Sequence, residues 1–354
     1  MNFRFTGKKI SGIHVVLPKR TLNFMDDMTA CGFPPERSRR LAQVMGYDKH
    51  RVVDEGTCVS DLAVDGIQFL VDQKLLSPDE FDALLVLTQS PDHFMPPTAN
   101  IIQGRLKLKQ DLFCMDIAQG CAAWLVGLIQ AFLLLEQPSI RKVLLIAGDV
   151  ISRKVCTRDR SSFPLIGDGI GIAIVEKHPD ATPIYANLKM DGANGSALTI
   201  PAGGFRKPSS YQTSIELPAE DQNFRSADQL VMDGTAVFNF VQRAVPPMID
   251  DLLLQANCPE PSIDYYLFHQ PNRFMLEKLA AKMKVHPSRM PNNVVEKFGN
   301  SSGATIPTNI VLNLDKQLAN QSLNVCLAGF GAGLTWSSML TQLGPLRFCS
   351  LQEV

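Results

Sequence analysis

The sequence has little net charge and few charged residues. Among its 354 residues the formal net charge is -1, and 19% of the residues are charged. Such a balance disfavours a nucleic-acid partner that is recruited by overall charge. The chain also lacks a membrane-spanning run of about 20 apolar residues, and its first residues lack the apolar core of a signal peptide. We therefore expect a cytoplasmic protein with neither a nucleic-acid nor a membrane partner.

The patterns of metal sites and disulfides are also missing. The eight cysteines are scattered with no C-x-x-C pair, and no two of the six histidines lie three to five residues apart. Zinc sites typically need such spacings. A cytoplasmic chain is also expected to keep its thiols reduced. The sequence therefore predicts reduced cysteines, no metal and no bound cofactor.

The chain does contain a large hydrophobic fraction, 45% of its residues, which is enough for a large core. Short apolar runs alternate with longer segments of helical period, and this indicates layers of helices and strands. Strands are predicted at 81–90, 112–118, 142–151, 264–270 and 324–330, and helices at 98–108, 121–137, 234–256, 273–285 and 304–319. The helix at 121–137 is apolar on nearly all sides, so we expect it to lie between two sheets.

A polar, irregular segment separates the two groups of elements. Residues 191–230 contain glycine, proline, serine and charges without a sustained period, which predicts a long loop. Loops of that length inside a compact chain are usually functional. We place the boundary between two halves near Pro179, and we expect residues 1–178 and 179–354 to form them.

Two glycine-rich stretches do not fit the motifs that they resemble. Residues 167–171 read GDGIG but lead into a strand-like run, whereas a dinucleotide-binding loop opens a helix. Residues 299–303 read GNSSG, yet a hydrolase with that motif needs a histidine after its serine, and the last histidine here is His286. Neither interpretation is retained.

Cys121 is the strongest single candidate for chemistry. It lies where a strand-like run ends and a helix-like run begins. A thiol at a helix N-terminus is expected to have a lowered pKa and to act as a nucleophile, although a lone cysteine is more often a core residue. His269 follows a predicted strand, at the end where α/β folds bind ligands, and Asn300 lies in a turn flanked by glycine. Each of the three has an ordinary structural explanation when taken alone.

Together these residues lie in motifs whose order and spacing resemble β-ketoacyl-acyl-carrier-protein synthase III and its relatives in the thiolase superfamily. The motifs are DIAQGCAAW around Cys121, LIGDGIGIAIV at 165–175, FHQPN at 268–272, GNSSGAT at 299–305 and GFGAGLTW at 329–336. The resemblance spans nearly the whole chain. It implies an α/β fold of thiolase type, with five layers (αβαβα) made of two similar halves, assembled as a homodimer.

The same resemblance implies the roles of the site residues. Cys121 takes an acyl group from a thioester, and the backbone N–H groups of Cys121 and Ala332 hold the oxyanion that forms. His269 and Asn300 hold the enolate that forms when a malonyl thioester loses carbon dioxide. Ala332 stands where the family's loop has its middle glycine.

Further positions follow from the resemblance. Met95 stands where relatives have a phenylalanine that reaches across the dimer to line the acyl pocket, and Arg160 and Asn272 match positions that contact ligands. Arg40 and Val44 stand where relatives that use coenzyme A carry a tryptophan and an arginine. A basic patch that suits an acidic carrier protein consists of Arg273, Lys278, Lys282 and Lys284.

The expected function is a decarboxylating condensation. Acyl-coenzyme A or an acyl-carrier protein loads Cys121, and malonyl-carrier protein then extends the acyl group. One alternative is an acyltransferase in which His269 acts as general base for an alcohol or amine acceptor. The other is a partner subunit of a heteromeric synthase, which the presence of all three active residues disfavours. The departures at Arg40, Val44 and Met95 favour specialised metabolism over primary fatty-acid synthesis.

Overall fold

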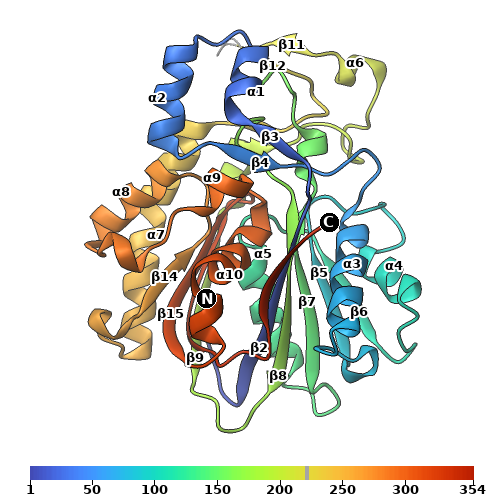
Figure 1. The fold of residues 1–354 in the computed structure, drawn as a ribbon, viewed down its shortest axis with the longest axis vertical. Coiled ribbons are helices and arrows are strands. Elements are labelled where there is room, and N and C mark those ends of the chain that lie inside the picture. The colour runs from blue at the N-terminus through green and yellow to red at the C-terminus, as the bar shows by residue number, and fades with distance from the viewer. Residues whose placement is uncertain (220–222) are drawn as a thin grey trace.

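The computed structural model describes residues 1–219 and 223–354. Its elements form five stacked layers, in which two sheets alternate with three layers of helices (Figure 1). This is the αβαβα arrangement that the family resemblance implies, and the alternation of helices and strands that the sequence predicts is confirmed. Among the described residues, no helix combines the length and the apolar character that crossing a membrane requires.

The first sheet has six strands in the order β17-β2-β8-β7-β5-β6. Strands β7, β5 and β6 run parallel, whereas β8 runs antiparallel to both β7 and β2. Strand β5 is buried along its whole length, as expected for a parallel strand that is covered on both faces. The bounds are β2 (Lys8–Leu17), β5 (Ala83–Leu87), β6 (Phe113–Ile117), β7 (Lys142–Asp149), β8 (Gly169–Lys177) and β17 (Cys349–Glu353).

The second sheet has five strands in the order β1-β9-β16-β15-β14. Strands β14 and β15 pair parallel, and the other neighbours pair antiparallel. The carboxyl ends of β14 and β15 therefore lie together at one end of the sheet. The bounds are β1 (Asn2–Phe5), β9 (Ile184–Met190), β14 (Tyr265–Phe268), β15 (Leu323–Gly331) and β16 (Thr335–Leu343).

Helices form the other three layers. The outer face of the first sheet is covered by α3 (Val59–Asp72) and α4 (Thr98–Arg105), and that of the second sheet by α7 (Gly234–Ala256) and α8 (Arg273–Met283). Between the sheets lie α5 (Ala123–Leu134) and α10 (Thr305–Leu318), which pack against both. Nine of the 12 residues of α5 are buried, so its position explains its apolar sequence.

The first strand of the chain belongs to the second sheet, and the last strand belongs to the first sheet. Strand β1, near the N-terminus, pairs with β9 in the second sheet, and β17, near the C-terminus, pairs with β2 in the first. The remaining strands of the first sheet come from residues 8–177, and those of the second sheet from residues 184–343. The expected boundary at 178/179 falls between β8 and β9, and the division into two halves stays a prediction.

A group of short elements lies beyond one end of both sheets, at the top of Figure 1. It contains β3 (Thr21–Asn23), α1 (Phe24–Ala30), α2 (Pro35–Met45), β4 (Lys49–Arg51) and α6 (Tyr211–Ser214). The predicted loop at 191–230 supplies part of this group through brief strands, β10 (Leu198–Thr199), β11 (Leu217–Pro218) and β12 (Phe224–Arg225), and β13 (Val231–Met232) follows it. Residues 220–222 of that loop lie outside the described residues.

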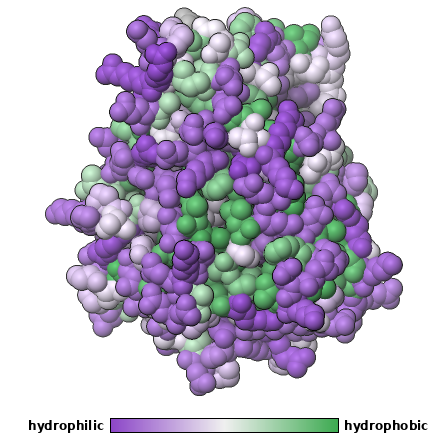
Figure 2. Space-filling model, in the orientation of Figure 1, coloured by the Kyte–Doolittle hydropathy of each residue, from purple (hydrophilic) through white to green (hydrophobic). Residues whose placement is uncertain are grey.

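Hydrophilic side chains cover most of the face seen in Figure 1, and hydrophobic side chains gather near its centre (Figure 2). The strands and helices predicted from the sequence are all present. Most have somewhat shorter bounds, whereas α7 has the predicted bounds and β15 is longer by one residue at each end. As predicted, residues 167–171 lead into strand β8 and not into a helix.

Candidate active site

Cys121 lies in the tight connection between β6 and α5. The N–H of Ala123 donates to the carbonyl oxygen of Gly120 at 2.7 Å, and α5 begins at Ala123. The backbone of β15 passes very close to this turn. A Cβ on Gly331 would lie 2.6 Å from the Cβ of Cys121 and 2.8 Å from its Sγ. Any side chain at position 331 would therefore collide with the thiol.

The thiol of Cys121 does not have the lowered pKa that its place before a helix predicts. Burial raises the pKa of Cys121, against hydrogen bonds from the backbone of Ala332, the Ser302 side chain and its own backbone. The buried carboxylate of Asp149 raises this pKa further. The prediction was wrong because removing a thiolate from water costs more than the partial charge of a helix end returns. Cys121 therefore rests as a thiol, and a thiol needs a base before it can act as a nucleophile.

His269 follows β14 directly and is almost fully buried. Its N–H donates to the carbonyl oxygen of Ala328 at 2.7 Å, and the edge of its ring meets the Phe330 ring with 5.6 Å between centroids. Nδ1 of His269 lies 2.6 Å from Oγ1 of Thr305. Burial lowers the pKa of His269 to about 3, and a hydrogen bond with the Ser302 backbone opposes this only in part. The imidazole is therefore neutral near pH 7.

Asn300 follows α9 (Val294–Phe298) and Gly299. Its backbone is held by the first half of the chain: its N–H donates to Leu165 at 2.8 Å, and its carbonyl accepts from the N–H of Gly167 at 3.1 Å. The side-chain Oδ1 accepts from the N–H of Ser302 at 3.0 Å, which fixes the orientation of the amide. The hydrogens on Nδ2 are then the groups with which this side chain can donate to a ligand. A Cβ on Gly167 would lie 2.2 Å from the carbonyl oxygen of Phe298, which explains a glycine there.

Two cavities meet at these residues. The outer cavity, about 530 Å³, is lined by Cys121, His269 and Asn300 together with apolar residues of the α1–α2 region, α7 and α8. The inner cavity, about 390 Å³, is also lined by Cys121 and Asn300, and its other walls include Ile151, Leu198, Ile200, Leu230 and Met232. Cys121 and Asn300 therefore border both cavities: the outer one, which also contains the His269 imidazole, and the inner one, which has mainly aliphatic walls.

The two backbone groups expected in the oxyanion hole lie beside the thiol. The N–H groups of Ala332 and of Cys121 both form hydrogen bonds with the Cys121 sulfur. Ala332 also lines the inner cavity, immediately after Gly331 ends β15. Backbone donors in this position are available to an oxygen that gains negative charge next to the sulfur.

Of the other three residues predicted to contact ligands, the structure places two in the wall of the outer cavity and one outside both cavities. Arg160 and Asn272 line the outer cavity, with the Arg160 guanidinium over the Phe33 ring at 5.2 Å from its centroid. Asn272 also caps α8, since its side chain accepts from the N–H of Met275 at 2.8 Å. Met95, 79% exposed, does not line the two cavities around Cys121.

Arg40 and Val44 are exposed on α2 and lie outside the lining of the outer cavity. They stand where relatives that use coenzyme A are expected to carry nucleotide contacts. The residues that α2 does place in the cavity wall are Leu41 and Met45, which are apolar. This face of the outer cavity therefore offers apolar contact to a ligand.

The predicted docking residues lie on or next to α8. Lys278, Lys282 and Lys284 are exposed, whereas Arg273 forms an ion pair with Glu296 at 2.6 Å. Nζ of Lys278 lies 5.3 Å from the ring centroid of Phe274, a residue of the outer cavity wall. The patch thus borders the outer cavity, and its net charge depends mainly on the three lysines.

Three buried polar residues of the site were not singled out from the sequence. Oδ1 of Asp149 accepts from the N–H of Gln89 at 2.6 Å and from the Thr88 hydroxyl at 2.9 Å. Ser302 forms hydrogen bonds with both Cys121 and Asp149. Thr305 contacts His269. Both Ser302 and Thr305 belong to the GNSSGAT motif. Their closeness to Asn300 in the sequence is the one feature that could have predicted a place in the site.

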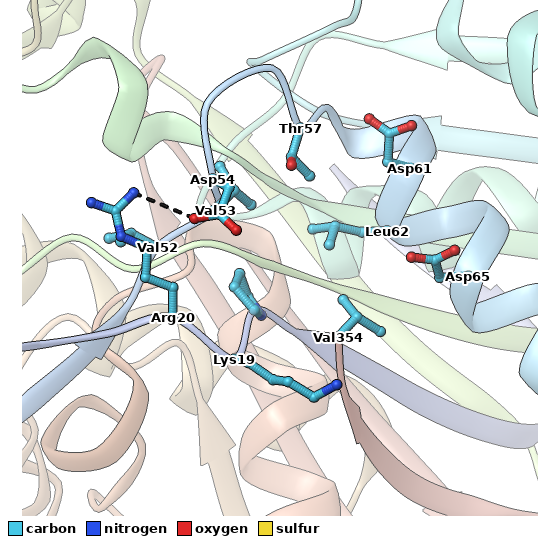
Figure 3. A pocket seen from close by; sticks show the side chains of 11 residues that line it. Lys19, Arg20, Val52, Val53, Asp54, Thr57, Asp61, Leu62, Asp65 and Val354 are labelled. Carbon is cyan, nitrogen blue, oxygen red and sulfur yellow. Dashed lines mark ion pairs between the residues drawn. The ribbon is translucent and has the colours of Figure 1, made fainter.

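A further cavity, about 330 Å³, has charged walls and lies elsewhere. Lys19, Arg20, Asp54, Asp61 and Asp65 line it, and Arg20 pairs with Asp54 at 3.6 Å (Figure 3). The 11 residues drawn there include none of those predicted to form the site. Within residues 1–219 and 223–354, no group of three or more His, Cys, Asp or Glu side chains is arranged to hold a metal ion.

Two family models match the chain. The model for 3-oxoacyl-[acyl-carrier-protein (ACP)] synthase III matches residues 115–192, and the model for the C-terminal part of that synthase matches residues 253–343. The first match contains Cys121, and the second contains His269, Asn300 and Ala332.

Individual relatives match over nearly the whole length. A β-ketoacyl-[acyl-carrier-protein] synthase III of Streptococcus suis is 32% identical over 338 residues, 95% of this chain and 98% of that protein. The crystal structure of a 3-oxoacyl-(acyl-carrier protein) synthase from Burkholderia xenovorans LB400 matches with a TM-score of 0.92 and 30% identity, and covers 100% of this chain and 99% of that one. The priming β-ketosynthase of the R1128 polyketide pathway shares the fold, with a TM-score of 0.78 and 22% identity over 96% of this chain and 97% of that one.

The fold and these relatives define the chain as a thiolase-type enzyme of the transferase class. It belongs to the 3-oxoacyl-[acyl-carrier-protein] synthase III family.

The buried, neutral His269 predicts acid-sensitive stability. Its pKa is about 3 in the folded chain, and an unfolded histidine titrates near 6.5. Between these two pH values the unfolded chain binds a proton that the folded chain does not. The free energy of unfolding therefore falls by about 1.4 kcal/mol for each pH unit below about 6.5, down to a pH of about 3. Urea denaturation of the wild-type protein and of His269→Gln at several pH values between 4 and 7 checks this.

We expect His269→Gln to have a smaller fall in the free energy of unfolding as the pH decreases. His286→Gln is the matched control, because His286 is exposed, and it is expected to keep the wild-type slope. A slope that does not change in His269→Gln would contradict the assignment of a neutral buried imidazole.

Proposed function

We propose that the chain forms a carbon–carbon bond in two steps. An acyl thioester first transfers its acyl group to Cys121, and a malonyl thioester then loses carbon dioxide and attacks the acyl-enzyme. The observation that carries this proposal is the position of Cys121 between the two cavities. The aliphatic inner cavity suits an acyl chain, and the outer cavity gives the carrier of either substrate access to the sulfur.

The first step uses the thiol and the backbone donors beside it. As the sulfur attacks the thioester carbonyl, its oxygen becomes negative, and the N–H groups of Cys121 and Ala332 are proposed to hold it. Both N–H groups already point to the sulfur, which supports this role. The thiol or carrier of the first substrate then leaves, and the acyl group remains in the inner cavity.

The second step uses the two residues of the outer cavity. Loss of carbon dioxide from the malonyl group leaves an enolate, whose oxygen needs two hydrogen-bond donors. We propose Asn300 Nδ2 and His269 Nε2 as these donors. Apolar walls exclude water, which would otherwise hydrolyse the acyl-enzyme or protonate the carbanion.

The donor is proposed to be an acyl-coenzyme A or an acyl-carrier protein, and the extender malonyl-carrier protein. Arg160 and Asn272 are proposed to contact the carrier arm, since both line the outer cavity. The apolar surface of Leu41 and Met45, with Arg40 outside the lining, supports a donor that makes few polar contacts with this face.

Replacement of the nucleophile tests the proposed reaction. We expect Cys121→Ala to form no covalent acyl adduct and no β-ketoacyl product with any acyl donor from acetyl- to dodecanoyl-coenzyme A, followed by malonyl-acyl-carrier protein. Intact-protein mass spectrometry detects the adduct, and release of carbon dioxide detects condensation. Cys114→Ala is the control, because Cys114 lies on β6 and outside both cavities around Cys121.

Normal product formation by Cys121→Ala would refute the proposal. Discharge of the wild-type adduct by an alcohol or amine, without carbon dioxide, would instead identify the acyltransferase alternative.

The lysines of α8 are proposed to dock an acidic carrier protein. Lys278 lies against Phe274 at the wall of the outer cavity, and Lys282 donates to the carbonyl oxygen of Gln242 at 2.7 Å, which links α8 to α7. Positive charge here steers a negatively charged partner toward the cavity that holds the thiol.

Charge reversal tests the docking surface. We expect Lys278→Glu to raise KM for malonyl-acyl-carrier protein by about tenfold at low salt and to leave kcat unchanged, because the charge acts on encounter. Steady-state kinetics at two salt concentrations measure this. Lys316→Glu, an exposed position on α10, is expected to behave as the wild type. An equal effect of both substitutions would refute a specific patch.

A homodimer is also proposed, with an exposed aromatic surface as its contact. Phe94 is 76% exposed and Phe205 is 88% exposed, and their rings lie 5.6 Å apart between centroids. Met95 follows Phe94 in sequence and is 79% exposed. Exposed apolar side chains that cluster in this way are typical of a protein contact. In such a dimer we propose that Met95 reaches across to the acyl pocket of the partner copy, as the family resemblance implies.

Light scattering tests the dimer. We expect a mass of twice the chain mass of 39.0 kDa, and we expect the double variant Phe94→Asp/Phe205→Asp to have the mass of one chain. Leu254→Asp is the control, because Leu254 is also apolar and is 82% exposed but lies on α7. A wild-type monomer would refute the dimer, and dissociation by Leu254→Asp would place the contact elsewhere.

A further inference from the structure

The hydroxyl group of Thr305 lies among three polar atoms. Oγ1 is 2.6 Å from Nδ1 of His269 and 3.0 Å from the carbonyl oxygen of Ser302, and the N–H of Gln270 donates to it at 3.3 Å. The Thr305 side chain is fully buried at the start of α10. Because the side chain is shielded from solvent, the single Thr305 hydroxyl group must form the hydrogen bonds with all three of these atoms.

The number of hydrogens decides how the contacts are made. Thr305 has one hydroxyl hydrogen, the carbonyl oxygen of Ser302 can only accept, and the N–H of Gln270 can only donate. If the hydroxyl donates to Ser302, its two lone pairs accept from Gln270 and from a hydrogen on Nδ1 of His269. All three contacts are then hydrogen bonds.

The opposite arrangement leaves one contact unmade. If the hydroxyl donated to Nδ1 of His269, no hydrogen would lie between Oγ1 and the carbonyl oxygen of Ser302, which are 3.0 Å apart. Two buried oxygens would then face each other with lone pairs only, which is costly in a buried site.

We propose that Thr305 is a positioning residue that keeps the hydrogen of neutral His269 on Nδ1, so that Nε2 presents a lone pair that accepts the thiol proton of Cys121. This inference rests on the proposed function. It supplies the base that a buried thiol needs, and it uses two residues that line the same cavity.

The proton balance of the reaction agrees with this assignment. Cys121 passes its proton to Nε2 as the S–C bond to the acyl group forms, and Nε2 gives this proton to the thiolate that departs from the donor. His269 is therefore neutral in the acyl-enzyme, and it takes one proton from solvent at Nε2 when the negatively charged malonyl group binds beside it. Nε2–H donates to the enolate oxygen while the C–CO2 bond breaks and the new C–C bond forms. When the bond between Sγ and the acyl carbon breaks, the Cys121 thiolate takes the proton from Nε2, and neutral His269 is restored.

Loss of the Thr305 hydroxyl is expected to affect the two steps differently. In Thr305→Val, a hydrogen on Nδ1 loses the hydroxyl oxygen that accepts it at 2.6 Å and keeps only the contact of His269 with the Ser302 backbone, so we expect the tautomer equilibrium to shift toward a hydrogen on Nε2. Nε2–H cannot take the thiol proton, but it is already the donor that the enolate needs. We expect the rate of Cys121 acylation to fall by about tenfold to a hundredfold, and decarboxylation by enzyme that is already acylated to be retained.

The experiment measures the two steps separately. Single-turnover acylation is followed by intact mass with the acyl-coenzyme A that the wild-type protein accepts. Enzyme acylated to completion and freed of donor is then mixed with malonyl-acyl-carrier protein, and release of carbon dioxide is timed. Thr305→Ser, which keeps a hydroxyl group, is expected to restore acylation.

Thr308→Val is the matched control. Thr308 is also fully buried on α10, and its hydroxyl donates to the carbonyl oxygen of Ala304 at 2.7 Å without contact to His269. Its substitution is expected to leave both steps unchanged. The ¹⁵N spectrum of histidine-labelled protein gives a second measurement: His269 Nε2, identified by its absence in His269→Gln, is expected to lack a hydrogen in the wild type and to carry one in Thr305→Val.

The outcomes separate this inference from the proposed function. Equal loss of both steps in Thr305→Val, unchanged acylation, or failure of Thr305→Ser to restore it would overturn the inference while the wild type still condenses. A wild-type protein that forms no acyl adduct or releases no carbon dioxide would refute the proposed function itself.

Discussion

The site depends on how closely the backbone at three glycines approaches the turn that holds Cys121. These are Gly303, Gly329 and Gly331. A Cβ on Gly303 would lie 2.8 Å from the Cβ of Ala123, and one on Gly329 would lie 3.0 Å from the Cα of Ala122. With Gly331 at the thiol itself, these contacts bring β15 and the start of α10 against the central helix. His269, whose N–H donates to Ala328 on β15, and Asn300, which lies five residues before α10 begins at Thr305, are held by the same approach. A larger residue at any of these glycines would move the Cys121 thiol away from His269 and Asn300.

Burial acts in opposite directions on the two titrating groups and gives one result. It raises the pKa of Cys121 and lowers that of His269, so the resting pair is a thiol and a neutral imidazole. A neutral pair costs less than a thiolate and an imidazolium among aliphatic walls. In the proposed reaction, charge appears only as bonds form and break, next to N–H groups that already lie beside the sulfur. The apolar surroundings that suit an acyl chain are therefore compatible with ionic chemistry.

The sequence was most informative where one pattern had one physical cause. The apolar run at 121–137 indicated a helix between sheets, and the ordered motifs indicated the family. The pKa of Cys121 was wrongly predicted because the position before a helix can be read from sequence, whereas desolvation depends on packing. The roles of Ser302 and Thr305 depend on which atoms they contact, and serine and threonine after a turn have many ordinary uses. The strands β1 and β17 are short, and their pairing joins residues from opposite ends of the chain.

That pairing has a consequence for synthesis. Strand β2 is made almost at once, but the neighbour on one of its sides is β17, which comes from residues 349–353. While the ribosome makes the rest of the chain, that side of β2 presents unpaired N–H and C=O groups to any other extended segment. The first sheet can therefore form its last strand pair only after the whole second sheet has been translated. Although most of its strands are synthesised first, this sheet is among the last parts of the fold to be completed.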